Sequence, residues 1–248
     1  MLSKKLVDLA QAQCKNVPVK KISHEAPQVG VVSVSDHFRD GNVHLISNYW
    51  GLDSFLEAPL PDKKLTVAYV GTAAKRYVEF EEPARFADAE RAWLDRQQKS
   101  DRLNYFDYCI SGKRAEQIEE DLSGADVVFV GGGNTQYLHE QLQCTGADDI
   151  IRTLVKNGTW YLGKSAGAIV AGPSIEPRGF LMDSMASAPI KNPQGLGLTN
   201  VYPLPHIDTP SIMSKEYAGK SGWQHAIELS STAPTAYILD NLNKEKHT

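Results

Sequence analysis

The feature that most constrains the fold of this chain is the alternation of two kinds of segment. Short β-branched apolar runs alternate with stretches whose apolar residues recur at helical spacing. Parallel strands need crossover connections, usually helices, so this pattern is typical of an α/β protein. The runs predict strands at 29–34, 43–47, 65–70, 103–110, 127–130, 159–162, 201–205 and 236–239. Helices are predicted at 83–98, at 114–124 with Gly124 as the C-cap, and at 136–143. The predicted fold class is α/β, an open, mostly parallel sheet flanked by helices.

The length and apolar content fit one such domain. The chain has 248 residues, of which 42% are hydrophobic, enough to bury one sizeable core. We expect a single α/β domain over residues 28–248. Residues 1–27 differ, because a short amphipathic helix is followed by a polar segment that contains proline. We interpret them as an N-terminal arm that packs on the sheet edge or mediates association, which makes a homodimer a candidate assembly.

Charge and cysteine content exclude several classes of function. The net charge is −4, and acidic and basic residues are mixed along the chain, so we expect no nucleic-acid partner. The three cysteines, Cys14, Cys109 and Cys144, are widely spaced and form no zinc motif, which predicts reduced thiols and no metal. The N-terminus lacks a signal-peptide pattern, and no apolar run approaches the length of about 18 residues that a membrane span needs. We expect a soluble, cytoplasmic protein that uses no cofactor.

A candidate nucleophile follows the predicted strand 159–162. The sequence Gly163-Lys164-Ser165-Ala166-Gly167 passes directly into a run of small residues. A nucleophile elbow needs this order, because a strained turn between strand and helix raises the serine hydroxyl above the sheet edge. The GxSxG pattern alone is weak, and the alternative is an ordinary turn serine. The strand-turn-helix context favours a catalytic Ser165.

A glycine-rich loop follows the preceding predicted strand, 127–130. Its sequence is Gly131-Gly132-Gly133-Asn134-Thr135. We interpret it as part of an oxyanion hole, with the amide of Gly132 or Gly133 joined by that of Ala166. We also expect Asn134 and Thr135 to contact substrate. The alternative is a turn capped by Asn134 or Thr135; phosphate binding is weaker, because neither phosphate-binding motif is present.

A serine nucleophile needs a base and an orienting acid. His206 ends an apolar run, where a strand would bring it to the edge that holds Ser165, whereas His225 lies in a helical pattern; we predict His206 as the base. Three carboxylates lie near enough in sequence to be the acid: Glu176, Asp183 and Asp208. We predict Asp183, because it lies in the segment between the serine and the histidine.

Three basic residues lie closest in sequence to this constellation: Lys164, Arg178 and Lys191. Any of them could bind the carboxylate of an acidic substrate, and each could also be an ordinary solvated side chain. We predict Arg178 as the main contact, because its planar guanidinium can bind a carboxylate through two hydrogen bonds, with Lys164 as a further substrate contact.

These motifs, in this order, resemble the peptidase E (aspartyl dipeptidase) and cyanophycinase family. The residues that carry the resemblance are VVFVGGGNT at 127–135, YLGKSAGA at 161–168 and the pair Pro205-His206. The resemblance implies a fold like that of class I glutamine amidotransferases, a Ser-His-acid triad, no metal, and removal of an N-terminal aspartate from dipeptides. Lys164 stands where peptidase E has a large aromatic residue.

Two other functions compete with a serine dipeptidase. One is an α/β-hydrolase esterase, which shares GxSxG. The interval from Ser165 to His206 is short for that fold, in which further strands and helices usually separate the two residues. The other is a catalytically inactive relative that acts as a binding module.

Overall fold

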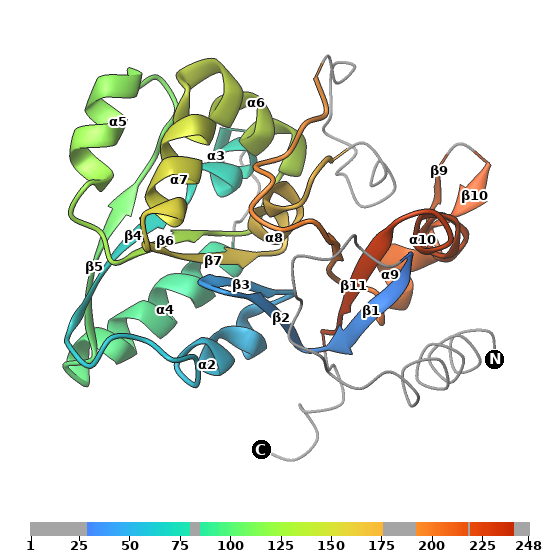
Figure 1. The fold of residues 1–248 in the computed structure, drawn as a ribbon, viewed down its shortest axis with the longest axis horizontal. Coiled ribbons are helices and arrows are strands. Elements are labelled where there is room, and N and C mark those ends of the chain that lie inside the picture. Colours follow the sequence, from blue (N-terminus) through green and yellow to red (C-terminus); the bar gives the residue numbers. More distant parts are fainter. Residues whose placement is uncertain (1–28, 80–84, 176–191, 218, 241–248) are drawn as a thin grey trace.

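The largest sheet has six strands, in the order β2-β3-β7-β6-β4-β5. The computed structural model describes residues 29–79, 85–175, 192–217 and 219–240 (Figure 1). The strands of the large sheet are His37–Asp40 (β2), Val43–Ile46 (β3), Leu65–Val70 (β4), Leu103–Tyr108 (β5), Val127–Val130 (β6) and Trp160–Lys164 (β7). Neighbouring strands run parallel except for the edge pair of β2 and β3, which is antiparallel.

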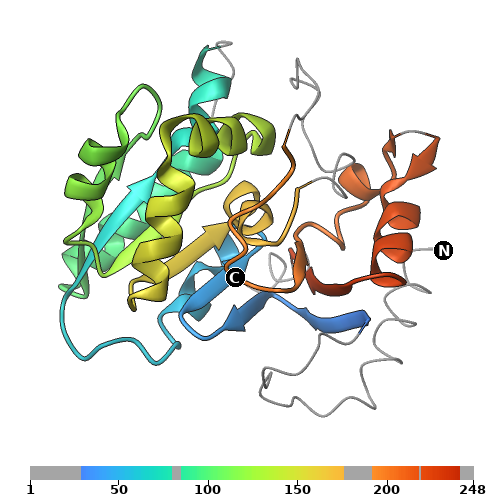
Figure 2. The same cartoon turned by 45° about the horizontal axis from the view of Figure 1, so that its top comes forward.

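A second, three-stranded sheet lies beside the β2–β3 edge (Figures 1 and 2). It has the order β1-β11-β8, with bounds Gly30–Ser35 (β1), Pro234–Ile238 (β11) and Tyr202–Leu204 (β8). Both of its pairings are parallel. A short antiparallel pair, Glu216–Tyr217 (β9) with Lys220–Ser221 (β10), projects next to it.

The predicted fold class is confirmed, and each of the eight predicted strands is present to within a few residues. The two-residue strands β9 and β10 and the four-residue edge strand β2 were not predicted. These strands are short and carry little apolar content, so they leave no pattern of buried residues to recognise. The division of the strands between two sheets was also not predicted, because strand patterns do not encode pairing.

Helices cover both faces of the large sheet (Figure 1). Four lie on one face: Thr72–Glu79 (α3), Ala115–Leu122 (α5), Thr135–Thr145 (α6) and Ala147–Lys156 (α7). The other face carries Leu52–Phe55 (α2), which follows the 3-10 turn Tyr49–Gly51 (η1), and Arg85–Lys99 (α4). The short helix Ala166–Ala171 (α8) begins where β7 ends. The three predicted helices correspond to α4, α5 and α6, although Ser123, not Gly124, is the C-cap of α5.

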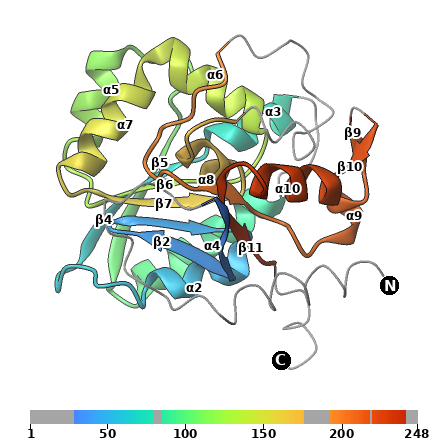
Figure 3. The same cartoon turned by 45° about the vertical axis from the view of Figure 1, so that its right-hand side comes forward.

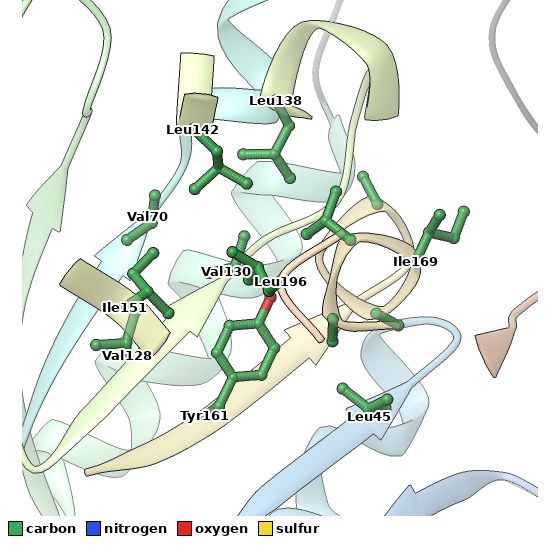
Figure 4. Packing of buried hydrophobic residues seen from close by; sticks show 14 of the residues in the cluster. Leu45, Val70, Val128, Val130, Leu138, Leu142, Ile151, Tyr161, Ile169 and Leu196 are labelled. Carbon is green, nitrogen blue, oxygen red and sulfur yellow. The ribbon is translucent and has the colours of Figure 1, made fainter. Parts of the chain in front are cut away.

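Strand β6 shows why the core has two halves. All four of its residues are buried. Val128 and Val130 pack in the cluster under α6, α7 and α8 (Figure 4). Val127 and Phe129 pack in the other cluster, on the α4 face. Successive side chains of a strand point to opposite faces, so a strand covered on both sides is apolar throughout. Burial on both faces therefore explains the continuous apolar run from which β6 was predicted.

The second sheet has a small core of its own. Helix α10 (Gly222–Ser230) lies along it, next to the short helix α9 (Pro210–Met213) (Figure 3). A separate cluster joins these elements through Leu204, Met213 and Tyr237. The predicted N-terminal arm, 1–27, lies outside the described residues, so the proposed division into an arm and one domain stays a prediction.

Candidate active site

Ser165 lies in a strained turn between β7 and α8. Its backbone angles are φ 50° and ψ −105°, a region that a residue with a side chain rarely adopts. Such a conformation costs about 1–3 kcal/mol and persists only where the surroundings enforce it. Here the amide of Ser165 donates to the carbonyl of Ile46 at 3.0 Å, which ties the turn to the end of β3.

The small residues around Ser165 allow the elbow to form. A side chain at Gly167 would place its Cβ 2.0 Å from the carbonyl oxygen of Val130, and one at Gly163 would lie 2.7 Å from the carbonyl oxygen of Gly167. Only glycine fits these contacts, because real Cβ atoms do not approach that closely. The GxSxG pattern is therefore required by the packing of α8 against the ends of β6 and β7, which is the context that a nucleophile elbow needs.

His206 reaches Ser165 from the second sheet. It follows β8 and also has a left-handed backbone, with φ 61°. Its Nε2 lies 2.9 Å from Oγ of Ser165, within hydrogen-bond distance. The structure thus joins the predicted nucleophile and base, although they come from different sheets. The alternative base, His225, lies on α10.

The other ring nitrogen of His206 faces Asp240. Its Nδ1 lies 2.9 Å and 3.0 Å from the two carboxylate oxygens of Asp240, which follows Leu239 just after the end of β11. The side chain of Asp240 is only 6% exposed. The three side chains form the continuous Ser-His-acid chain that nucleophilic catalysis by serine needs.

Two hydroxyl groups hold the carboxylate of Asp240. The hydroxyl of Ser47, at the end of β3, donates to Oδ1 at 2.5 Å and accepts the backbone N–H of His206 at 2.7 Å. The hydroxyl of Thr209 donates to Oδ2. Burial by itself raises the pKa of the Asp240 carboxyl, but hydrogen bonds from His206, Ser47 and Thr209 outweigh it and lower the pKa below its ordinary value. Asp240 is therefore held as an anion.

The prediction of the acid from sequence misses Asp240. Asp183, the predicted acid, lies outside the described residues, as does Glu176. Asp208, the third candidate, accepts the backbone N–H of Asp240 at 2.6 Å. The carboxylate on the His206 ring comes from the end of a strand that follows the histidine, not from the segment between serine and histidine. The signal that could have found it is the one that found His206: a polar residue directly after an apolar strand.

The glycine-rich loop lies against the nucleophile. A Cβ built on Gly132 would stand 3.4 Å from Cβ of Ser165. The amide of Gly132, however, donates to the buried carboxylate of Glu90 at 3.1 Å, so the predicted oxyanion role is wrong for this amide. Gly133, the alternative donor, has φ 139°. It and Ala166 remain the candidate oxyanion donors.

Two predicted substrate contacts have structural positions instead. Asn134 and Thr135 are buried, with exposed fractions of 2% and 3%. The side chain of Asn134 accepts the amide of Tyr137 at 2.8 Å, which makes it the N-cap of α6. The alternative stated from sequence, a capped turn, is therefore correct for Asn134.

Lys164 is likewise not at the surface. It is 4% exposed, and its ammonium group pairs with the carboxylate of Glu90, which is fully buried on α4. The prediction of Lys164 as a substrate contact is therefore wrong, because its charge is neutralised inside the protein. Arg178 and Lys191, the other two cations considered, lie outside the described residues.

No metal site or membrane span accompanies the triad in the part of the chain that the structure describes. Within residues 29–79, 85–175, 192–217 and 219–240, no three His, Cys, Asp or Glu side chains gather as metal ligands would. In the same residues, no helix combines the length and apolar character needed to cross a membrane.

Comparison with known proteins places this arrangement in a family. The model of Peptidase family S51 matches residues 47–243, most of the chain. The chain belongs to this family. The matched range contains the whole triad of Ser165, His206 and Asp240, together with Ser47. The resemblance to peptidase E noted from the motifs is thereby confirmed.

Curated relatives agree with the family assignment. "Uncharacterized peptidase PM1590" of Pasteurella multocida is 30% identical over 156 residues, which cover 62% of this chain and 70% of that protein. "Peptidase E" of Haemophilus influenzae is 37% identical over 132 residues, or 52% of this chain and 56% of that protein. A solved Listeria monocytogenes structure named "Putative Peptidase E Protein" has a TM-score of 0.57 at 27% identity, covering 66% of this chain and 78% of that one. With several of the curated relatives, the chain matches only about half of the relative's length.

Proposed function

We propose that this S51-family chain is a serine peptidase that hydrolyses dipeptides with N-terminal aspartate. The single observation that carries the catalytic part is the contact chain from Oγ of Ser165 through the ring of His206 to the carboxylate of Asp240. This geometry supports transfer of the serine proton to a base that is fixed in the required tautomer.

In the first half of the reaction, Oγ of Ser165 attacks the carbonyl carbon of the scissile peptide bond. Its proton passes to Nε2 of His206, while Asp240 accepts the hydrogen bond of Nδ1–H and stabilises the imidazolium. The carbonyl oxygen becomes an oxyanion that the amides of Gly133 and Ala166 would bind. The C–N bond then breaks, and His206 gives its proton to the departing amine, which leaves an acyl ester on Ser165.

In the second half, a water molecule replaces the amine. His206 takes one of its protons as the water oxygen attacks the ester carbonyl, and the same amides bind the second oxyanion. The ester bond breaks, Oγ of Ser165 recovers a proton from His206, and the carboxylic acid leaves. The balance of the cycle is one peptide bond and one water consumed, with no cofactor required.

The substrate class rests on the family. Relatives carry the name Peptidase E, and the resemblance of the GGGNT and GKSAGA segments to peptidase E implies cleavage of Asp-Xaa. An acidic side chain needs a cation, and Lys164 is already paired with Glu90. Arg178 is therefore the cation that we propose for this role.

A substrate panel tests the proposal. Asp-Leu and Asn-Leu have nearly the same shape, and only the first carries a side-chain charge. We expect kcat/KM to favour Asp-Leu strongly in the wild type, and Arg178→Ala to remove most of that preference. Equal rates for the two dipeptides would contradict the acidic specificity, whereas a preference that survives Arg178→Ala would move the role to another cation such as Lys191.

The two competing functions make different predictions in the same assays. An esterase would hydrolyse p-nitrophenyl esters far faster than aspartyl p-nitroanilide. An inactive binding module would not react with a fluorophosphonate, which needs an activated serine. We expect labelling of Ser165 and turnover of the anilide.

A further inference from the structure

A buried carboxylate lies directly beneath the proposed oxyanion loop. Glu90 is fully buried on α4, yet three donors from three neighbouring strand ends converge on it. The hydroxyl of Tyr69, in β4, donates to Oε2, the amide of Gly132, just after β6, donates to Oε1 at 3.1 Å, and the ammonium group of Lys164, the last residue of β7, pairs with Oε1. One side chain thus links the carboxyl ends of β4, β6 and β7.

The packing of the loop depends on this cluster. A Cβ on Gly131 would stand 2.5 Å from Oε2 of Glu90, and one on Gly132 would stand 3.1 Å from Cε of Lys164. The loop backbone is therefore in close contact with the ion pair. Lys164 precedes Ser165 in the chain, so the same pair touches the loop on one side and the elbow on the other.

Burial explains why the cluster holds one geometry. Removing a carboxylate and an ammonium group from water is unfavourable unless both are paired and hydrogen-bonded. The buried Tyr69 hydroxyl has a pKa raised by burial and by the neighbouring charge of Glu90, so it stays protonated and donates. The three strand ends are thereby fixed relative to each other.

We propose that Glu90 is a positioning residue for the oxyanion hole. By holding the amide of Gly132, its carboxylate turns the next peptide so that the amide of Gly133 faces the carbonyl oxygen attacked by Ser165. Lys164 neutralises Glu90 and holds it between loop and elbow. This inference rests on the proposed function, because it assigns a role in the same acyl-transfer step.

A paired substitution separates positioning from folding. Glu90→Met with Lys164→Met removes both charges together, so neither is left buried alone, and methionine keeps an unbranched chain of similar length. The amide of Gly132 loses its acceptor, and the loop is free to shift. Replacement of a buried ion pair by apolar residues is often neutral for stability, so we expect the double variant to fold.

Two rates should fall in this variant. One is kcat for Asp-Leu, which we expect to drop by roughly 10²–10³, the effect of losing one oxyanion donor, while KM changes little. The other is the rate of labelling by a fluorophosphonate. In that reaction Oγ bonds to phosphorus, fluoride leaves, the serine proton passes to His206, and the phosphoryl oxygen gains negative charge in the same hole.

Tyr69→Phe is the milder test, because it removes one hydroxyl and keeps the ring. We expect both rates to fall by about tenfold at most, since Glu90 keeps its other two partners. Tyr108→Phe is the matched control: its hydroxyl also donates to a carboxylate, that of Asp121 at 3.0 Å, but away from the loop. It should leave both rates unchanged.

The outcomes separate this inference from the proposed function. A double variant with wild-type kcat and labelling rate would overturn the positioning role, whatever its stability, as would equal losses in Tyr69→Phe and Tyr108→Phe. If the wild type is labelled but cleaves no dipeptide, only the proposed substrate class is contradicted. The labelling rates of the variants would still test the positioning role of Glu90. A wild type that is not labelled would overturn both.

Discussion

The two sheets contribute to one active site by different means. The six-stranded sheet supplies Ser165 and the glycine-rich loop, and it sets their positions mainly through backbone packing, with Gly167 against Val130 as the tightest contact. The three-stranded sheet supplies His206 and Asp240 from the ends of β8 and β11. Their positions depend on side-chain hydrogen bonds, several of which come from Ser47 on the other sheet.

The two halves of the site also differ in how far apart their residues lie in the sequence. The elbow is contained in five consecutive residues, and its glycines are needed for steric reasons. The base and the acid lie in separate segments that become neighbours only when β8 and β11 pair with each other. We therefore expect the nucleophile side to tolerate substitutions poorly near the elbow, and the base side to depend on a few polar side chains that join the sheets.

The largest expected effect comes from Ser165→Ala. Removing the nucleophile should lower kcat by ~10⁶, since a triad acts as a unit. Stability should change little or rise slightly, because alanine keeps the Cβ and loses only a part-buried hydroxyl. The measurement is turnover of Asp-Leu by the purified variant, with thermal unfolding as the control. Retention of more than a few per cent of activity would remove Ser165 from the mechanism.

On the other sheet, Asp240→Asn should lower kcat by about 10⁴, because an amide favours the wrong imidazole tautomer. Asp208→Asn is the matched control, since the carboxylate of Asp208 accepts the backbone N–H of Asp240 and an asparagine oxygen can still accept it. The two variants, together with Asp183→Asn, decide the identity of the acid. A larger loss in Asp183→Asn than in Asp240→Asn would return the role to the residue predicted from sequence.

The link between the sheets is tested by Ser47→Ala. This change leaves the amide of His206 and one oxygen of Asp240 without the hydroxyl that joins them. Loss of such a partner costs about 1–3 kcal/mol of stability, and we expect kcat to fall roughly tenfold as the ring loses its fixed orientation. Ser47→Thr, which keeps the hydroxyl, should restore part of the loss. A stability change with unaltered kcat would make Ser47 a structural residue only.

The contrast between local and distant contacts also explains which parts of the site could be predicted from the sequence. Strand β6 and the elbow at Ser165 were predictable, because continuous apolar burial and steric need for glycine leave local patterns. His206 was predictable from a strand end. Asp240 was missed because the three candidate acids, Glu176, Asp183 and Asp208, lie closest in sequence to the serine and histidine, although Asp240 too follows a predicted strand.

Buried charges were the least predictable part of the site. Lys164 looks like a substrate contact beside the nucleophile, and Glu90 looks like one more acidic residue on the amphipathic helix α4. Neither residue carries a local signal of its partner, because the pairing forms only when α4 packs under the ends of β6 and β7. Predicted cations near an active site therefore need a test for buried partners before a substrate role is assigned.

The smallest expected effect concerns pH and the edge of the large sheet. His44, on β3, is fully buried, its ring stacks on that of His37 at 4.9 Å, and its Nε2 lies 3.0 Å from the hydroxyl of Ser54. Burial, followed by the charges of His37 and Arg39, lowers the pKa of His44 from 6.5 to about 3. The folded protein thus holds His44 neutral, while the unfolded chain protonates it as the pH falls below 6.5.

The sign of the effect follows from this difference. The contribution of neutral His44 is fully present above pH 6.5 and is lost as the pH falls from 6.5 towards 3, at about 1.4 kcal/mol per pH unit. Between pH 7.5 and pH 5.5, His44 should therefore account for a loss of about 1.4 kcal/mol in the free energy of unfolding of the wild type, measured with urea. His44→Leu should remove that part of the pH dependence, because leucine cannot titrate. An unchanged slope in the variant would show that a group other than His44 causes the loss of stability at low pH.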